Sequence, residues 1–330
     1  MKQIQVTASI LLAISLYLIN AISPQISVYL KYDNLNNFFN IQLISIIIAI
    51  GLYYLLKNLS YDKWFNKIGI YLFYISSLGI VIIPLLPISM TNTLYGSIIH
   101  INIFGFNFNP FIFYSIGFVF IIDYIYNKFS NLKLANVRSI FILLLTSLLF
   151  IYSRNYSDLS VLYFVFFAMF IYNNNHSKIL PYFVFGNISV VVYFLVSSPY
   201  RLNRIISWWN DGNNLDWQNN PDTFLHSNLL NSLNSNLGIF FFVIVIILFI
   251  FLVYKLFVLK KNSSNPTFII GIASLVFVPM LFNILFTLNL FPIYQPSIYF
   301  FGYGFNIILS SAIIIIMMNM IIKYNNQGKQ

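Results

Sequence analysis

The sequence has no cysteine and no glutamate, and only 7% of its 330 residues are charged. The absence of cysteine excludes disulfides and thiolate metal sites. A soluble domain usually has about a quarter of its residues charged, so this chain has too few polar side chains to cover a globule of its size in water. The histidines are far apart in sequence and show no metal-ligand spacing: His100, His176 and His226. Any carboxylate chemistry must use one of seven aspartates: Asp33, Asp62, Asp123, Asp158, Asp211, Asp216 and Asp222.

Hydrophobic residues make up 59% of the chain, and they are gathered into long runs. About 20 helical residues, rising about 1.5 Å each, cross the hydrocarbon of a membrane. Runs of this kind lie at 5–23, 38–57, 67–88, 110–126, 138–153, 158–174, 179–197, 237–260, 267–290 and 298–322. The pattern predicts an all-α polytopic membrane protein with about ten transmembrane helices, forming a single integral membrane domain over 1–330.

The boundaries of two of these runs need an argument. The polar stretch 153–158 predicts a break between the fifth and sixth runs, because unpaired charge in lipid is costly. The first run follows Lys2 and resembles a signal peptide, with Ala21-Ile22-Ser23 as a cleavage site. Pro24 follows that site directly and nine more runs come after it, so we expect an uncleaved first helix.

The formal net charge of +10 is distributed in a way that argues against nucleic acid as a partner. The basic residues are scattered in short loops between apolar runs, which is how membrane topology is specified. With the N-terminus inside, thirteen of the seventeen basic residues fall on the cytoplasmic side. We therefore expect a multi-pass protein of the plasma (inner) membrane, in contact with membrane lipids, with both termini cytoplasmic.

Two extracytoplasmic segments are more than connectors. Residues 89–109 alternate apolar and polar side chains, which predicts a small hairpin or an interfacial lid. Residues 198–236, between the seventh and eighth runs, form the longest polar segment, which predicts a large extracytoplasmic loop.

The start of this large loop has the residues best suited to bind a ligand. Arg201 and Arg204 are three apart and share a face if the segment is helical, beside the pair Trp208-Trp209. Two guanidinium groups at headgroup depth could hold a phosphate or diphosphate bidentately. The alternative is ordinary lipid anchoring by arginine and tryptophan. Further along the loop, Asp222 precedes His226 and could act as a general base, or could be one more solvated loop aspartate.

Other polar residues favour structural interpretations. Arg154 and Asp158 flank a short turn, where we expect a salt bridge. Asp123 lies near Lys128 at the inner end of the fourth run, which favours a surface pair over a proton relay. The stretch 302–304, Gly-Tyr-Gly, is expected to open or break the last span. No phosphate-binding loop, dinucleotide fingerprint or hydrolase elbow is present.

The order of motifs resembles the SEDS family, the FtsW/RodA-type proteins of cell division and elongation. The most specific match is Pro199-Tyr200-Arg201-Leu202-x-Arg204-Ile205, which is similar to the family's PYRLxRl stretch after the seventh span. Weaker matches follow the same order along the chain: Ser157-Asp158-Leu159-Ser160 with PDLGT, 283–292 with NIG…LP, and 298–304, which includes Tyr303, with LPFISYGG. Gly96 and Asn109-Pro110 lie where the family has NGAxRW and QPSE.

This resemblance implies a peptidoglycan glycosyltransferase. Family members polymerise glycan strands from lipid II on the outer face, beside a class B penicillin-binding transpeptidase. The implied substrate contacts are Arg201, Arg204, Asp158, His226, Asn228 and Tyr303, with undecaprenyl diphosphate as the leaving group. No metal ligands are indicated and no cofactor is assigned, although a diphosphate could bring a divalent cation with it.

The sequence departs from the family at positions that matter for catalysis. The family's essential acid, in an HTD-like stretch, corresponds to Asn228 in His226-Ser227-Asn228, and asparagine cannot act as a base near neutral pH. The arginine of NGAxRW and the acid of QPSE fall at Ile99 and Ile112, and the serine of SYGG at Gly302. Either Asp222 has taken over as catalytic base or the chain no longer catalyses.

Three functions therefore remain open. The first is a glycan-strand polymerase acting in division or elongation, between which the sequence does not decide. The second is an inactive scaffold that recruits a penicillin-binding protein. The third is a lipid-linked oligosaccharide flippase or another glycan polymerase, and the scarcity of charges in the helix centres counts against transport.

Overall fold

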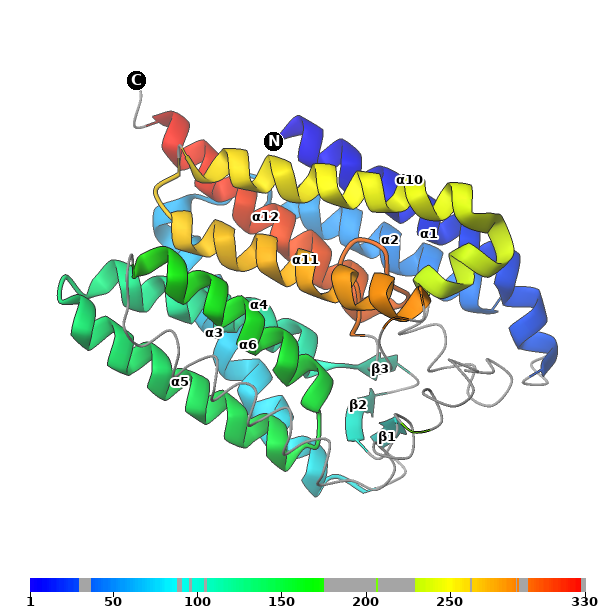
Figure 1. Cartoon of the computed structure of the whole chain (residues 1–330), viewed down its shortest axis with the longest axis horizontal. Coiled ribbons are helices and arrows are strands. Elements are labelled where there is room, and N and C mark those ends of the chain that lie inside the picture. The colour runs from blue at the N-terminus through cyan, green and yellow to red at the C-terminus, as the bar shows by residue number, and fades with distance from the viewer. Residues whose placement is uncertain are drawn as a thin grey trace.

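The structure is a computed structural model of the whole chain (Figure 1). It describes residues 1–29, 37–87, 91–94, 97–103, 106–174, 206, 229–261, 263–288, 290 and 296–327. Within this part of the chain, nine helices are long and apolar enough to cross a membrane. The predicted polytopic helical membrane fold is confirmed, and the seventh predicted run, 179–197, lies outside the described residues.

The helices follow the apolar runs, with shifts at their ends. The predicted bounds of the loop 198–236 are wrong at its end, because α10 (Leu229–Lys260) begins eight residues before the predicted run 237–260. The bounds of the helices are α1 (Lys2–Tyr29), α2 (Asn37–Leu56), α3 (Tyr61–Ile82), α4 (Pro110–Lys128), α5 (Leu132–Tyr152), α6 (Tyr156–Asn173), α10 (Leu229–Lys260), α11 (Pro266–Thr287) and α12 (Phe305–Gln327). A single 3₁₀ turn, η1 (Ile83–Leu85), extends α3.

Asparagine side chains fix the starts of three of these helices. Asn109, Asn131 and Asn155 stand before α4, α5 and α6, and the side chain of each accepts hydrogen bonds from backbone N–H groups of the first turn. The first N–H groups of a helix have no partner within it, which is why such caps are favoured. The cap at Asn155 separates α5 from α6, and the predicted break between these spans is confirmed.

The last span begins later than predicted. Residues 298–304 form turns instead of helix, and α12 starts only at Phe305. Gly304 has a φ of +95°, a backbone conformation that favours glycine. The predicted break at 302–304 is therefore confirmed, while the expected start of the span at 298 is wrong.

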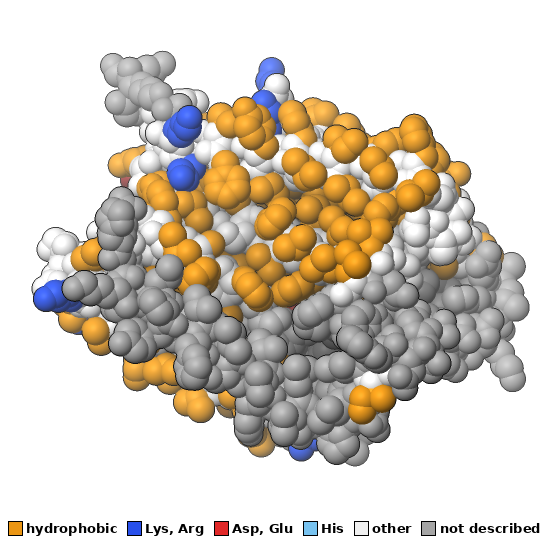
Figure 2. Space-filling view, in the orientation of Figure 1, with side chains coloured by type: hydrophobic (Ala, Val, Ile, Leu, Met, Phe, Trp, Pro, Cys, Tyr) orange, Lys and Arg blue, Asp and Glu red, His pale blue; other side chains and the backbone are white. Residues whose placement is uncertain are grey.

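The helices divide into central and lipid-facing members. The span windows of α4, α11 and α12 are 78%, 72% and 67% buried inside the protein, whereas those of α2, α3 and α10 are only 17%, 22% and 28% buried. Figure 2 shows apolar side chains covering the face over α10, as a surface in contact with lipid requires. The lipid-facing helix α3 packs very closely against the central helix α4: a Cβ added at Gly117 would lie 2.6 Å from the Phe73 backbone nitrogen.

A small antiparallel sheet precedes α4. Its strands are β1 (Thr91–Leu94), β2 (Ser97–Ile103) and β3 (Phe106–Phe108), in the order β1-β2-β3. Thr91 pairs with Ile101, and Ile101 pairs with Phe108. The alternating pattern of 89–109 thus forms three strands, one more than a hairpin.

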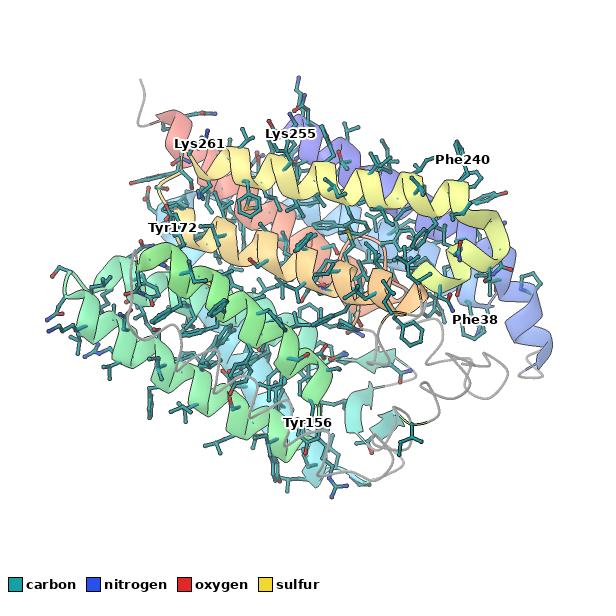
Figure 3. The ribbon with its side chains drawn as sticks, in the orientation of Figure 1. Phe38, Tyr156, Tyr172, Phe240, Lys255 and Lys261 are labelled. Atoms are coloured by element: carbon teal, nitrogen blue, oxygen red, sulfur yellow. The ribbon has the colours of Figure 1, made fainter. Side chains whose placement is uncertain are left out.

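The bundle has two distinct ends, called here the sheet end and the terminal end. At the terminal end, Gln5 of α1 donates to the Tyr53 hydroxyl of α2 and Lys323 of α12 donates to the Lys57 carbonyl, so both termini lie at this end. Figure 3 shows Lys255 and Lys261 on this side of the bundle and Phe38, Tyr156 and Phe240 toward the sheet end. The charge pattern that predicted a common side for the termini corresponds to this arrangement.

Candidate functional site

The predicted site residues fall into two groups. Arg201, Arg204, Asp222, His226 and Asn228 lie outside the described residues. The other two, Asp158 in the first turn of α6 and Tyr303 just before α12, both lie toward the sheet end of the bundle. Asp158 comes two residues after Tyr156 and Tyr303 packs against Phe38, and Figure 3 labels both of these neighbours there.

Asp158 and the cap residue Asn155 bond to each other reciprocally. The Asn155 Nδ2 donates to the Asp158 Oδ2 at 2.8 Å, and the Asp158 backbone N–H donates to the Asn155 Oδ1 at 3.4 Å. No ion pair with Arg154 forms among the described residues, and the expected salt bridge is wrong. The Asp158 carboxylate binds the side-chain amide of Asn155 within the first turn of α6, whereas the Arg154 side chain is exposed. The Asp158 Oδ1 has no hydrogen-bond partner in the part of the chain that the structure describes.

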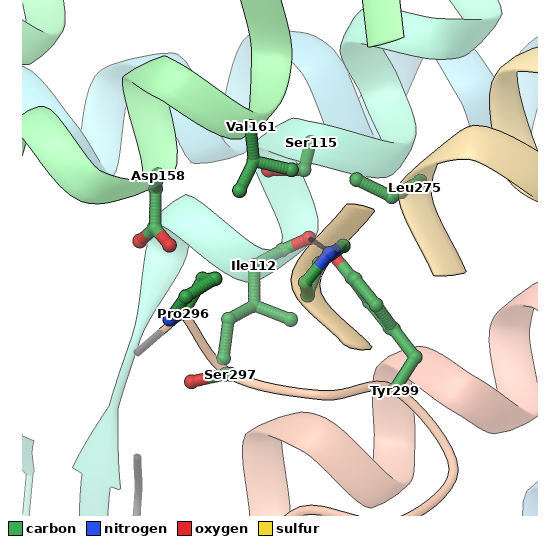
Figure 4. A pocket seen from close by; sticks show the side chains of 9 residues that line it. Ile112, Ser115, Asp158, Val161, Leu275, Pro296, Ser297 and Tyr299 are labelled. Carbon is green, nitrogen blue, oxygen red and sulfur yellow. Dashed lines mark hydrogen bonds between the residues drawn. The ribbon is translucent and has the colours of Figure 1, made fainter. Parts of the chain in front are cut away.

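A small pocket lies beside the Asp158 carboxylate (Figure 4). Its volume is about 10 Å³, close to the space that one water molecule needs. It lies between α4, α6, α11 and the chain before α12, and it is lined by Ile112, Ser115, Asp158, Val161, Leu275, Pro279, Pro296, Ser297 and Tyr299. One carboxylate and three hydroxyl groups line an otherwise apolar wall, so this space suits one water molecule or a single hydroxyl group of a ligand.

Tyr299 closes the pocket from the side of α12. Its side chain is buried and its hydroxyl donates to the Ile112 carbonyl at 3.2 Å, as the dashed line in Figure 4 marks. Burial, and after it the negative charge of Asp158, raises the pKa of Tyr299. The phenol therefore stays neutral and acts as a hydrogen-bond donor at physiological pH.

Tyr303 is also buried, and its ring packs against Phe38 of α2 with the centroids 5.9 Å apart. The chain from Pro296 to Gly304 places Tyr299 and Tyr303 on one short segment at the sheet end, although the sequence argument named only the second.

Asp123 is not the surface residue that was predicted. It is 1% exposed, and its carboxylate accepts from Asn127 Nδ2, Asn265 Nδ2 and the Phe268 N–H at 3.0, 2.9 and 3.0 Å. Lys128 donates instead to the Tyr124 hydroxyl. The expected Asp123–Lys128 pair is wrong, because α11 supplies donors that sequence proximity does not reveal.

The described residues offer no metal centre, since no three His, Cys, Asp or Glu side chains gather among them. Gln42, which was not among the predicted site residues, is a fully buried amide on α2 that contacts the segment before α12. Asn40 and Gln42 are the two amides within the apolar run 38–57, and they were the signal that could have identified it, because polar groups inside a membrane need partners.

The comparison with protein families decides the relationship. The family model of the FtsW, RodA and SpoVE proteins, described as cell cycle proteins, matches residues 1–220. The chain belongs to this family. The resemblance noted in the sequence is confirmed, and the FtsW/RodA/SpoVE match includes the PYRLxR stretch, Asp158 and the sheet.

Similar proteins carry related names. Two Helicobacter pylori proteins, each named "Probable peptidoglycan glycosyltransferase FtsW", are 24% and 25% identical over 236 residues, which are 68% of this chain. The aligned part spans 60% of the length of each of these relatives.

Solved structures share the fold along nearly the whole chain. A chain from a peptidoglycan synthase complex, described as coordinating polymerization and crosslinking, has a TM-score of 0.76 at 14% identity, with 98% of each chain covered. The Thermus thermophilus rod shape determining protein RodA has a TM-score of 0.70 at 13% identity, covering 99% of this chain and 97% of that one. At such low identity these matches establish the fold of the FtsW/RodA/SpoVE family and leave the chemistry to be argued.

Proposed function

We propose that this protein is a peptidoglycan glycan-strand polymerase of the plasma membrane, which transfers a lipid II-linked disaccharide to a growing chain. The observation that supports it most is the family match over 1–220, together with a pocket at the sheet end that has one carboxylate and three hydroxyl groups. Both termini lie at the opposite end of the bundle. If the termini are cytoplasmic, as this proposal holds, the pocket lies on the extracytoplasmic side of the membrane.

The proposed chemistry needs an anion site and a base. Arg201 and Arg204 hold the diphosphate of the lipid-linked substrate, because guanidinium groups bind phosphate oxygens bidentately. A sugar hydroxyl attacks the anomeric carbon, the bond from that carbon to the diphosphate breaks, and undecaprenyl diphosphate leaves with the electron pair. The hydroxyl proton goes to a carboxylate, for which Asp222 is our candidate.

The remaining candidates complete the substrate site in this proposal. Asp158, Tyr303, His226 and Asn228 contact the sugar or the diphosphate. Ile112, at the position of the family's QPSE acid, lines the same pocket as Asp158. The pocket thus has an apolar side chain where the family has a carboxylate, and Asp158 still offers an oxygen there.

The main alternative is a scaffold without catalytic activity, which recruits a class B penicillin-binding transpeptidase. Asn228 at the position of the family acid favours it. A flippase is less well supported, because the two buried or partly buried aspartates of the described spans, Asp123 and Asp158, lie at opposite ends of the bundle and form no path across it.

A polymerisation assay tests the proposal. Purified protein, with its transpeptidase partner, is incubated with labelled lipid II, and glycan strands are separated on a gel with the transpeptidase inhibited. We expect strands from the wild type and a loss of roughly 100-fold or more for Asp222→Ala, as for removal of a general base. Asp216→Ala, in the same loop, is the matched control and should stay near the wild type.

The arginines are tested in the same assay. Arg201→Ala and Arg204→Ala should each lower polymerisation, while Arg201→Lys should retain more of it, because a lysine keeps the charge but not the bidentate geometry. A wild type that binds its partner but makes no strands would establish the scaffold alternative. Reporter fusions that place Arg201 in the cytosol would refute the proposed site.

A further inference from the structure

The segment from Pro296 to Gly304 is a stretch of non-helical chain buried between helices. Eight of its nine residues are classed as buried, and only Ser297 is intermediate. Within a membrane protein, irregular backbone is tolerated only where it is enclosed by protein or lines a polar cavity. Each of its backbone N–H and C=O groups therefore needs an identifiable partner.

Part of this demand is met by α11, by α12 and by the segment itself. Asn283 of α11 donates from Nδ2 to the Pro296 carbonyl at 2.9 Å, and the Ser311 hydroxyl of α12 accepts from the Phe300 N–H at 2.9 Å. The Gly302 N–H donates to the Ile298 carbonyl at 2.9 Å. These bonds do not account for the Gly302 carbonyl or the Gly304 N–H.

A single side chain on α2 serves both of these groups. Gln42 donates from Nε2 to the Gly302 carbonyl at 3.3 Å and accepts at Oε1 from the Gly304 N–H at 2.9 Å. Its side chain is fully buried. A primary amide presents one donor side and one acceptor side in a plane, which is what a carbonyl and an N–H two residues apart require.

The residue between these two contacts is Tyr303. One helical turn before Gln42, Phe38 packs its ring against Tyr303 with the centroids 5.9 Å apart. Because residues four apart lie on one face of a helix, a single face of α2 fixes both the backbone on either side of Tyr303 and its ring.

The segment is held in a conformation that it would not adopt on its own. Phe300 has a φ of 66°, which is unusual for a bulky side chain and costs free energy. The surrounding contacts must stabilise this conformation. The side chains of Gln42, Asn283 and Ser311 reach the segment from α2, α11 and α12, and the Tyr299 hydroxyl adds a hydrogen bond to α4.

We infer that Gln42 is a positioning residue for the substrate site: it holds Tyr303, and with it the wall of the pocket formed by Pro296 and Tyr299, in place for the lipid-linked substrate. This inference rests on the proposed function, because it assigns the segment to the site that binds lipid II. Gln42 acts through the segment and does not itself contact the reacting atoms.

The test uses full-length protein in lipid nanodiscs with two measurements, the Kd for fluorescent lipid II and the KM for polymerisation. Gln42→Met keeps the size of the side chain and removes both hydrogen bonds to the segment, together with the bond that Gln42 Nε2 donates to the Ser15 hydroxyl of α1 at 3.4 Å. We expect its Kd and KM to rise roughly tenfold, the loss that corresponds to one or two hydrogen bonds, with kcat within about threefold of the wild type.

The matched control is Ser45→Ala on the same helix. Ser45 is buried, and among the described residues its hydroxyl donates only to the Ile41 carbonyl within α2. Ser45→Ala should lower the thermal stability, as the loss of any buried polar contact does, without raising the Kd for lipid II. An equal rise of Kd in Ser45→Ala would show that Gln42 has only a structural role.

Two further variants separate positioning from folding. Gln42→Glu, if Gln42→Met fails to fold, should approach the wild-type Kd as the pH is lowered, because a protonated carboxyl presents a donor and an acceptor to the same two atoms. In the double variant with Tyr303→Ala, Gln42→Met should add little to the effect of Tyr303→Ala, because both act on one contact.

The outcomes are distinct from those of the proposed function. A wild type that makes no glycan would end that proposal, whereas a Kd unchanged between wild type and Gln42→Met would overturn the inference about Gln42. Effects that multiply in the double variant would overturn it as well.

Discussion

Asp123 and Asp158 are two aspartates at opposite ends of the same bundle, and their surroundings differ. Three donors satisfy Asp123, among them the Phe268 N–H in the first turn of α11, so this carboxylate caps a helix from outside. Asp158 has one side-chain donor, Asn155, and it borders a pocket. A carboxylate whose two oxygens both accept hydrogen bonds within the protein has a structural role, whereas a carboxylate with one oxygen that accepts none can bind a ligand.

The largest effect on stability should come from Asp123→Ala. The change leaves Asn265 Nδ2 and the Phe268 N–H without their acceptor, and each unpaired buried donor costs about 1–3 kcal/mol. We expect the free energy of unfolding to fall by about 3 kcal/mol, measured by denaturant unfolding in detergent. Asp62→Ala, an exposed aspartate at the same end, is the control, and a loss of equal size there would remove the contrast between the two ends.

A smaller effect on stability and a larger effect on function should come from Asp158→Ala. Loss of its capping interaction costs about 1 kcal/mol, but we expect lipid II binding to weaken roughly tenfold if a substrate hydroxyl uses the spare oxygen. Asn155→Ala breaks the same cap and keeps the carboxylate. Two variants with equal stability and equal binding would show that Asp158 is only a capping residue.

The smallest effect should come from Tyr299→Phe, which loses one hydrogen bond to the Ile112 carbonyl and under about 1 kcal/mol at neutral pH. Burial raises the pKa of Tyr299, so the unfolded chain releases the phenolic proton near pH 10 while the folded chain retains it. Stability from this group is present below about pH 10 and is lost as the pH rises above it.

Melting temperatures at pH 8 and pH 10.5 check this prediction. The drop between the two values should be smaller for Tyr299→Phe than for the wild type. Tyr152→Phe, which changes an exposed tyrosine, should leave the drop unchanged. If the melting temperature of Tyr299→Phe falls between pH 8 and pH 10.5 by as much as that of the wild type, Tyr299 does not contribute to this pH dependence.

The sequence predicted those parts of the fold that depend on local composition. Apolar runs predict spans because length and hydropathy decide insertion, and the polar stretch 153–158 predicted a break where Asn155 caps α6. The alternation in 89–109 predicted extended structure, which the three strands confirm.

Contacts between distant residues could not be predicted in the same way. Closeness in sequence predicts a pair of Asp123 with Lys128, whereas the donor that Asp123 uses, Asn265, lies 142 positions away. The apolar run 298–322 predicts a span that begins at 298, because residues 298–301 are as apolar as the span that follows the break at 302–304. The turns of the segment 298–304 depend on Gln42 and Ser311, whose side chains reach it from other helices.

The bend in α10 limits the straight part of this helix to about the thickness of a membrane. Gly238 has φ 82° and ψ 171°, a combination open almost only to glycine, and Figure 1 shows the helix turning back there. The stretch 239–260 is about 33 Å long at about 1.5 Å per residue, close to the thickness of the lipid hydrocarbon, about 30 Å. The polypeptide therefore changes direction about one hydrocarbon thickness before Lys260, and residues 229–237 pack against the bundle through the buried side chains of Leu229, Leu230 and Leu233.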